Sequence, residues 1–437
     1  MSILVLIYIL NYIDRNNAAA ARLRGFQEDL SISDAQFASV LSILYLGYLI
    51  MQIPSNILLN FTGKPSVYLP SCMIAWGLLS VFTGLAHNFR SVLTIRFFLG
   101  SVEAAFFPGA LFMLSKWYKR DELGTRTAIL QCGNLLSNAV GSLLASFILD
   151  GMDGVLGHSA WRWLFFIEGS LTVAVAILAI FVLPDFPSSR AKWLTPEEHQ
   201  LAQDRLKEDA ITSDENRKED GGHLEGFLAA VRDWRVWWFA LTLTSLVASL
   251  SFNAYFPTLV ETFGFGTKVT LLLCAPPWTF ASFAAWWTSR RSDRLHSRFT
   301  HIAYSLAIAL LGFVVSVLSR NEVLRYLSFF LMAQSYSAFT LSMAWVSNTI
   351  IRPPNKRSVA VALINSVAQF GNIAGSYMWP RSWGHSYAAS YTICIIANVV
   401  ALSMCLALRN HLRSQNEMLS RDERAKGQVV QGFRYFL

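Results

Sequence analysis

About a dozen apolar stretches, each of roughly 20 residues, recur along this chain, and they decide what it can fold into. A helix of that length spans the hydrocarbon core of a bilayer, where a backbone without internal hydrogen bonds finds no partner. Since 54% of the 437 residues are hydrophobic and only 15% are charged, the chain has more apolar surface than a soluble core needs. The sequence therefore predicts an all-α integral membrane protein embedded in the lipid bilayer.

Twelve transmembrane helices can be placed along the sequence. They are expected near 1–22, 35–59, 67–86, 91–114, 126–149, 161–184, 233–256, 268–289, 300–318, 324–347, 357–379 and 387–408. A long polar segment follows the sixth span, so the spans divide six and six. Asn134 and Asn365 both lie eight residues after a loop arginine, Arg126 and Arg357, as expected of duplicated halves.

This division predicts two pseudo-symmetric six-helix bundles, 1–184 and 233–408, with a linker at 185–232 and a tail at 409–437. The short loops on the linker side hold twelve lysines and arginines, against seven in the opposite loops. Because cytoplasmic loops carry the excess of basic residues, the linker, the tail and both termini are expected in the cytoplasm. A signal peptide is the alternative for the first span, but it would lack the usual basic region.

Four of the charged residues inside these apolar stretches stand out: Asp14, Arg15, Arg96 and Glu103. A charge at the centre of a membrane helix costs at least ~2.5–3.5 kcal/mol, so it is retained for pairing, for a pathway or for a ligand. Adjacent helical residues point in different directions, so Asp14 and Arg15 are expected to serve different partners. Arg15 suits a carboxylate ligand, and Asp14 could hold Arg96. A static ion cluster is the structural alternative.

The fourth span places Arg96, Gly100 and Glu103 on one helix face, at i, i+4 and i+7. Gly100 forms a small-xxx-small pair with Ala104 that permits close helix packing, whereas Pro108 and the glycine after it weaken the helix. A structural ion pair with packing glycines explains Arg96 and Gly100. It explains the second acid less well, and a transport role is predicted for Glu103.

Polar residues at helical spacing should line water inside the bundle. The second span carries such a stripe at Tyr45, Tyr48, Gln52, Ser55 and Asn56. Further candidates in other spans are Gln131, Asn134, Asn253, Tyr255, Ser342, Trp345, Asn348, Asn365, Gln369 and Asn372. Any of them could instead only bond helix to helix.

Three more features concern structure and chemistry. Asp293 and Arg294 lie at a cytoplasmic helix end, where charge pairs could latch the two bundles, and Glu168 is expected to be structural.

No histidine pair has the spacing of metal ligands, and the sequence has no phosphate loop or nucleophile elbow. The sequence therefore predicts no enzyme, no metal and no cofactor. The net charge of +8 is spread over short runs between apolar segments, so nucleic-acid binding is not expected.

Several motifs together resemble the major facilitator superfamily, and within it the anion:cation symporter family, especially its fungal allantoate-permease-like branch. They are Asp14-Arg15-Asn16, Gln52-Ile53-Pro54-Ser55-Asn56, Arg96-Phe97 with Pro108-Gly109, Trp161-Arg162-Trp163 with Glu168-Gly169, Leu183-Pro184-Asp185-Phe186-Pro187, Lys192-Trp193-Leu194-Thr195 and Phe433-Arg434-Tyr435. The resemblance implies the fold of that superfamily and a monomeric plasma-membrane protein. It implies proton-coupled uptake of a small organic anion such as allantoate, nicotinate or pantothenate.

The resemblance also implies roles for individual residues. Arg15 would hold the substrate carboxylate, Asp14 and Glu103 would carry protons, and Tyr48 and Asn365 would complete the pocket. The loop between the second and third spans is degenerate by comparison with the family. Two alternatives stay open, namely a proton-antiport exporter of a metabolite and a nutrient sensor that binds without transporting.

Overall fold

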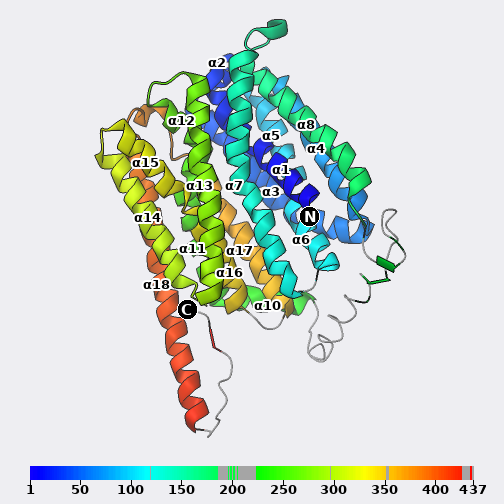
Figure 1. Cartoon of the computed structure of the whole chain (residues 1–437), viewed down its shortest axis with the longest axis vertical. Helices are drawn as coiled ribbons and strands as arrows, with labels where there is room; N and C mark the ends of the chain where they lie inside the picture. Colours follow the sequence, from blue (N-terminus) through cyan, green and yellow to red (C-terminus); the bar gives the residue numbers. More distant parts are fainter. Residues whose placement is uncertain are drawn as a thin grey trace. The chain divides into compact units, whose positions relative to one another are not determined.

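The computed structural model describes residues 1–118, 120–185, 195, 197–198, 200–201, 204, 223–295, 297–350, 354–425 and 434–435. All regular elements in these residues are helices (Figure 1). Most of the predicted linker therefore lies outside the described residues, as do Phe186, Pro187, Lys192, Trp193, Leu194 and Phe433 of the family motifs.

All twelve predicted spans are helical. Within the described residues, nine helical segments are long and apolar enough to cross a membrane. They are Asp34–Leu59, Pro65–Gly84, Phe89–Trp117, Ile129–Gly151, Ala160–Val182, Trp234–Glu261, Thr267–Leu295, Phe299–Leu318 and Ala388–Arg421. The other three predicted spans correspond to α1, to α15 with α16, and to α17.

The chain forms two compact units. Unit 1 comprises Met1–Lys218 and Ala254–Thr279, and unit 2 comprises Glu219–Asn253 and Phe280–Leu437. The helices of unit 1 are α1 (Ser2–Ala21), α2 (Phe26–Asp29), α3 (Asp34–Thr62), α4 (Pro65–Gly84), α5 (Phe89–Glu103), α6 (Phe106–Trp117), α7 (Arg120–Gly151), α8 (Ala160–Val182) and α12 (Phe256–Glu261). The helices of unit 2 are α10 (His223–Arg232), α11 (Trp234–Ser249), α14 (Phe299–Leu318), α15 (Glu322–Ala333), α16 (Tyr336–Thr349), α17 (Pro354–Gly375) and α18 (Ala388–Ala425). Helix α13 (Thr267–Leu295) begins in unit 1 and ends in unit 2. The predicted division at 184, 232 and 408 stays a prediction.

Local sequence signals fix where the helices of unit 1 begin and end. Ser33 and Gln36 form a capping box that starts α3, because each side chain accepts a hydrogen bond from the backbone N–H of the other. Asn88 caps α5 by accepting the N–H of Ser91 at 2.9 Å. Helix α3 ends at Gly63, whose positive φ of 62° is cheap only for glycine.

Close packing of α3 against α5 depends on glycines. A Cβ atom added to Gly100 would lie 1.9 Å from the carbonyl oxygen of Leu44, and one added to Gly47 would lie 2.2 Å from that of Phe97. The two backbones therefore meet where neither helix has a side chain, in agreement with the close packing expected at Gly100. In the same unit, α1 packs against α7 and α8, and α4 packs against α5 and α8.

The predicted fourth span is not one helix. It is interrupted at Ala104 and Ala105, between α5 and α6, rather than at Pro108 and Gly109 as the sequence suggested. The cause is still Pro108, because a proline cannot donate to the carbonyl four residues earlier, which belongs to Ala104, and its ring crowds that carbonyl. At the interruption, the N–H of Ala105 donates to the carbonyl of Val102, three residues earlier, at 3.2 Å, and not to the carbonyl four residues earlier as in an α-helix.

Two further predicted spans are also interrupted. The tenth breaks at Gln334 and Ser335, between α15 and α16, where the Gln334 amide donates to the carbonyl of Ser305 at 2.7 Å. The seventh changes from α-helix to a 3-10 helix at Leu250–Tyr255 before α12 begins. Pro257 enters α12 in its first turn, where a proline is tolerated.

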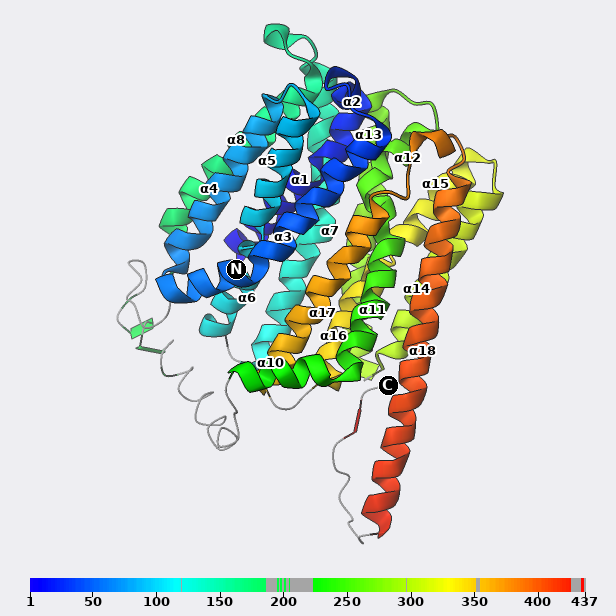
Figure 2. The ribbon, with the colours of Figure 1, turned by 180° about the vertical axis from the view of Figure 1, so that it is seen from behind.

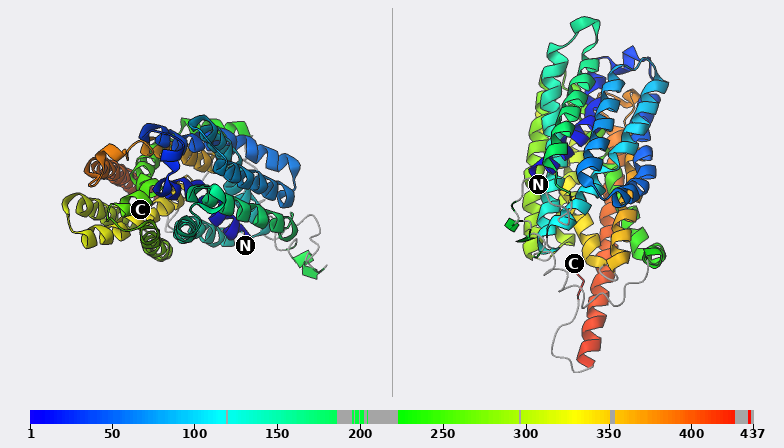
Figure 3. Two further views of the ribbon diagram at one scale, coloured as in Figure 1. Left: turned by 90° about the horizontal axis from the view of Figure 1, so that it is seen from above. Right: turned by 90° about the vertical axis from the view of Figure 1, so that its right-hand side faces the viewer.

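In unit 2, α11 packs against α17 and α18, and α14 packs against α15, α16 and α18. Helix α10 lies across the ends of α11 and α17 (Figure 2). Helix α18 runs to Ala425 and extends past the other helices of its unit (Figure 3). The predicted boundary between last span and tail at 408 therefore falls inside a continuous helix, whose polar second half is marked by charge, not by a helix end.

Candidate functional site

Five charged side chains from three helices of unit 1 form what we call the buried charge cluster: Asp14, Arg15, Arg96, Glu103 and Glu168. None is more than 8% exposed. Helix α1 supplies the first two, α5 the next two, and α8 the last. Arg96 interacts electrostatically with all three acids, so the five groups belong to one site.

Arg15 and Glu103 form an ion pair between α1 and α5. Both Nε and Nη2 of Arg15 lie 2.9 Å from the same carboxylate oxygen, Oε2. The other oxygen of Glu103, Oε1, is buried and has no hydrogen-bond partner among the described residues. Glu103 thus neutralises the guanidinium with one oxygen and keeps a second acceptor site unused.

Three tyrosine rings surround the Arg15 guanidinium. Its central carbon lies 4.7 Å from the ring centroid of Tyr12, 4.9 Å from that of Tyr48 and 6.0 Å from that of Tyr45. Such contacts favour a cation by up to about 2 kcal/mol when water is excluded. The polar stripe predicted on α3 therefore contributes Tyr45 and Tyr48 to the surroundings of Arg15.

The partners of Asp14 differ from the prediction. Its two carboxylate oxygens accept hydrogen bonds from the hydroxyls of Ser80 on α4 and Thr172 on α8, both at 2.7 Å. Arg96 does not pair with this carboxylate; it donates to the backbone carbonyls of Asp14 at 3.3 Å and Arg15 at 3.2 Å. The predicted pairing of the Asp14 and Arg96 side chains is wrong, because Arg96 approaches the backbone of α1 while the carboxylate faces α4 and α8.

Glu168 on α8, which the sequence led us to expect as a structural residue, is the fifth member of the cluster. It is 2% exposed, its Oε2 has no hydrogen-bond partner among the described residues, and it interacts electrostatically with Asp14 and Arg96. Its position two turns inside a predicted span matched the criterion that singled out Glu103. With Glu168 included, the cluster contains three carboxyl groups and two guanidinium groups.

Two further candidates of unit 1, Gln131 and Asn134, lie on α7, which packs against α1. Tyr8 donates to Gln131 at 3.4 Å, and Asn16 donates to Asn138 at 2.9 Å. The side-chain oxygen of Asn134 is buried without a partner among the described residues. Gln131 is therefore engaged in helix–helix bonding, while Asn134 keeps an unused acceptor.

The candidates of unit 2 have different surroundings. Trp345 is fully buried, with its ring against Phe239 at a centroid distance of 5.5 Å, the environment of a core tryptophan. Asn365 is half-buried on α17, where its backbone carbonyl accepts from Gln369. Asp293 forms an ion pair with Arg298 at 2.6 Å, which is local to its own loop, and Arg294 is exposed.

Among the residues that the structure describes, no group of three acidic, histidine or cysteine side chains is arranged so that it could hold a metal ion. What the buried charge cluster can do chemically is exchange partners. A carboxylate that reached Arg15 would compete with Glu103 for the same guanidinium, and a proton would bind one of three acids.

Comparisons with known proteins agree with this architecture. The chain is 30% identical to the MFS-type transporter cnsO of Penicillium expansum over 409 residues, which are 90% of this chain and 77% of that protein. It is 28% identical to a putative tartrate transporter of Agrobacterium vitis, over 93% of this chain and 91% of that protein.

A solved structure with a similar fold is a bacterial homologue of the human lysosomal transporter Spinster in an inward-facing, occupied conformation. It has a TM-score of 0.72 and 16% sequence identity, with 93% of this chain and 96% of that chain covered. The profile of the Major Facilitator Superfamily matches residues 4–376. This all-helical, multi-pass membrane protein therefore belongs to the Major Facilitator Superfamily of transporters.

Proposed function

We propose that this protein is a proton-coupled secondary transporter of a small organic anion, of the anion:cation symporter type, which works by alternating access. The observation that carries the proposal is the ion pair of Arg15 and Glu103, buried in an apolar helix bundle and surrounded by three tyrosines. A buried ion pair adds little to stability compared with apolar residues of similar size, so its presence in a membrane favours a functional role.

The charge balance of the pair links the anion to the proton. An anion that bound Arg15 while Glu103 stayed ionised would place two carboxylates on one guanidinium, and like charges at such distances repel strongly in a medium of low dielectric. A proton on Glu103 removes that repulsion and frees the guanidinium for the substrate. Anion and proton then bind together, which is the thermodynamic condition for their joint transport.

The name of one relative supports a carboxylate substrate. The putative tartrate transporter of Agrobacterium vitis is similar over nearly the whole chain, and tartrate is an organic dicarboxylate. A bidentate contact with a planar carboxylate is the interaction for which arginine is best suited. In this proposal Arg15 binds the carboxylate, Tyr48 and Asn134 contact the substrate, and Glu103, Asp14 and Glu168 are the acids that exchange protons.

The basic loops support an orientation with both termini in the cytoplasm. We propose that the protein acts as a monomer in the plasma membrane. For a symporter in that membrane, an outside-acid pH gradient drives uptake. A proton antiporter with the same acids would instead expel its substrate under that gradient.

Uptake into proteoliposomes tests the proposal. The full chain is reconstituted and offered labelled tartrate, allantoate or nicotinate under an outside-acid pH gradient, with nicotinamide as the uncharged match for nicotinate. At least one carboxylate should accumulate, nicotinamide should not, and collapse of the gradient with an ionophore should abolish accumulation. Accumulation that ignores the gradient would rule out proton coupling.

Two variants locate the coupling. Glu103→Gln should lose gradient-driven accumulation while it retains exchange of labelled for unlabelled substrate, because the proton site is gone and Arg15 remains. Arg15→Lys should lose both, because an ammonium cannot form the bidentate contact. Arg22→Lys is the matched control, since Arg22 is also a buried arginine near the end of α1 but pairs with Asp34 outside the cluster. Exchange that survives Arg15→Lys unchanged would remove Arg15 from the anion site.

A further inference from the structure

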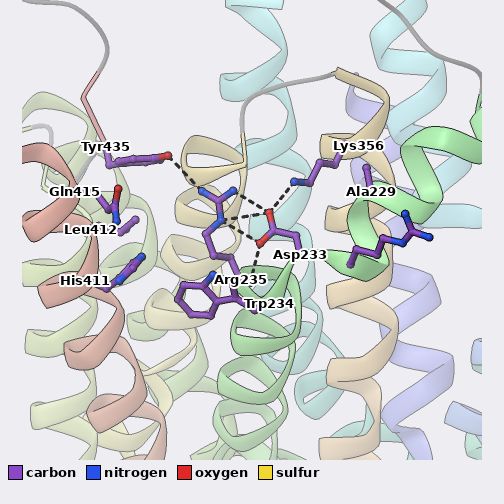
Figure 4. A pocket seen from close by; sticks show the side chains of 10 residues that line it. Ala229, Asp233, Trp234, Arg235, Lys356, His411, Leu412, Gln415 and Tyr435 are labelled. Carbon is purple, nitrogen blue, oxygen red and sulfur yellow. Dashed lines mark hydrogen bonds and ion pairs between the residues drawn. The ribbon is translucent and has the colours of Figure 1, made fainter. Parts of the chain in front are cut away.

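Unit 2 contains a cavity of about 500 Å³ that the proposed transport chemistry does not use. It lies where α10, the first turn of α11, the start of α17 and the second half of α18 meet, and Tyr435 forms part of its wall (Figure 4). Its charged lining consists of Arg232, Arg235, Lys356 and Asp233, with His411 beside them. Three permanent cations against one carboxylate leave an excess of positive charge in the cavity.

Asp233 organises two of the cations. Its carboxylate accepts from Nη2 of Arg235 at 2.9 Å and from the ammonium of Lys356 at 2.7 Å, so it ties α11 to α17 (Figure 4). Burial alone would raise the pKa of Asp233, but the hydrogen bonds from Arg235 and Lys356 outweigh it and lower the pKa to about 2. Asp233 is therefore ionised at neutral pH and holds both cations in fixed positions.

These contacts do not use all the donors. Lys356 has three ammonium N–H groups and donates one to Asp233, while Arg235 donates to Asp233 and to the hydroxyl of Tyr435. Arg232 is exposed at the end of α10 and adds a third cation. Arginine and lysine together suit a phosphate group, through forked and point-charge contacts respectively. A cavity of this size accommodates a headgroup-sized anion.

The surroundings of the cavity match the surface of a membrane. Trp234 and Trp237 in the first turn of α11 are 49% and 42% exposed, as are tryptophans of the aromatic belt at the level of lipid headgroups. Helix α10 lies across the ends of α11 and α17 and leaves Phe227 and Leu228 exposed, as an interfacial helix does (Figure 2). The cavity thus lies among exposed side chains of the kind typical of the level of lipid headgroups.

We propose that this cavity is a binding site for the phosphate group of an anionic phospholipid, held by Arg232, Arg235 and Lys356. Phosphate that is free in solution offers the same chemistry, but only a lipid would also cover the exposed aromatic and leucine side chains beside the cavity. The inference concerns unit 2 alone and does not depend on the proposed transport function.

Binding to the full chain in detergent tests the inference. The probes are dioctanoyl phosphatidic acid, dioctanoyl phosphatidylcholine as the zwitterionic lipid, and inorganic phosphate, each titrated while affinity is measured by microscale thermophoresis. We expect phosphatidic acid to bind at least tenfold more tightly than either of the others. Equal affinity for phosphatidic acid and phosphatidylcholine would overturn the site, and equal affinity for phosphatidic acid and inorganic phosphate would overturn the lipid as its ligand.

Variants assign the binding to this cavity. Arg232→Gln should weaken phosphatidic acid binding several-fold without harm to folding, since Arg232 forms no ion pair with another described residue, unlike Arg235 and Lys356. Lys356→Gln should weaken it further. Arg413→Gln is the matched control, because it removes an exposed arginine of α18 that pairs with Glu417 outside the cavity. The inference would be overturned if Arg232→Gln and Lys356→Gln left the affinity for phosphatidic acid unchanged. It would also be overturned if Arg413→Gln lowered that affinity as much as the two cavity variants do.

Discussion

A tyrosine beside Arg15 has two parts that can act separately: its ring, which contacts the guanidinium, and its hydroxyl, which a substrate could contact. Tyr48 presents its ring to the guanidinium at 4.9 Å and is 5% exposed. The ring holds the arginine in place through its face, and the hydroxyl is a separate polar group that a substrate could contact. The two contributions can be separated by substitution.

Tyr48→Phe should therefore change substrate affinity by less than Tyr48→Leu does. Loss of the ring face removes a contact of ~1–2 kcal/mol, which corresponds to about a tenfold loss of affinity, whereas loss of the hydroxyl leaves that contact intact. Affinity for the transported carboxylate, measured by competition in the exchange assay, checks this. Equal losses in the two variants would mean that the ring does not position Arg15.

Glu168 provides a second test at the scale of single residues. Glu168→Gln should leave thermal stability equal or higher, because an amide replaces a buried carboxyl whose Oε2 has no hydrogen-bond partner among the described residues. The same variant should shift the pH dependence of uptake, since one of three acids is gone, and Glu168→Asp should restore it. A fall in melting temperature together with an unchanged pH profile would make Glu168 a purely structural residue.

Sequence reasoning identified four of the five members of the buried charge cluster, because charge in an apolar span is visible without coordinates. It could not assign their partners. Arg15 and Glu103 are 88 residues apart, and which acid meets which arginine depends on how α1 and α5 are rotated against each other. Rotation is set by packing details such as the glycines of α3 and α5, and one sequence does not reveal them.

At the scale of helices, the contact between α3 and α5 sets the position of Arg96 and Glu103. Their backbones approach so closely at Gly100 that any side chain there collides with the carbonyl of Leu44. Because the obstacle is backbone, the two helices must separate to accommodate a larger residue.

Gly100→Ala should therefore lower the melting temperature in detergent by about 5 °C or more, since overpacking typically costs ~1–3 kcal/mol and each kcal/mol shifts the melting temperature by a few degrees. Gly151→Ala is the matched control, because a Cβ at Gly151 meets nothing within 4 Å. Differential scanning fluorimetry of both variants measures the effect. A melting temperature of Gly100→Ala equal to that of Gly151→Ala would contradict the packing described for α3 and α5.

Hydropathy located the spans within a few residues but missed the interruptions inside them. The breaks after Glu103 and after Ala333 both fall in the fourth span of a predicted half, and neither changes the apolar character of its segment. The hydropathy of a segment reports how favourably it transfers into lipid. An interruption of the helix depends instead on which backbone carbonyl loses its hydrogen-bond donor, as it does four residues before Pro108. The predicted boundary between the last span and the tail stays a prediction, because α18 continues through it and only the onset of charged residues marks it.

At the scale of the whole molecule, the ion pairs of Asp233 join segments that are far apart in the sequence. Asp233 precedes α11, and Lys356 lies in the first turn of α17. The carboxylate has a pKa of about 2, below its usual value of 3.8, because its hydrogen bonds outweigh the effect of burial. A depressed pKa stabilises the folded state above the usual value, and this contribution is lost as the pH falls through the lowered one.

Asp233→Asn should accordingly be less thermally stable than the unmodified protein at neutral pH. The difference in melting temperature should stay constant down to about pH 4 and should shrink between pH 4 and pH 2, as the wild-type carboxylate is protonated. Glu417→Gln, which breaks the exposed pair with Arg413, should show little difference at any pH. A difference for Asp233→Asn that persists unchanged at pH 2 would show that its ion pairs do not contribute to stability.

The odd number of groups in the buried charge cluster has an electrical consequence. With three acids and two arginines, the cluster carries one negative charge when every acid is ionised, and it is neutral when one acid holds a proton. A transmembrane voltage acts on a charge that moves through its field, at ~2.3 kcal/mol for each elementary charge per 100 mV. An inside-negative voltage pushes that charge outward, so in the proposed uptake cycle it would favour the outward-open form of the unprotonated, empty protein.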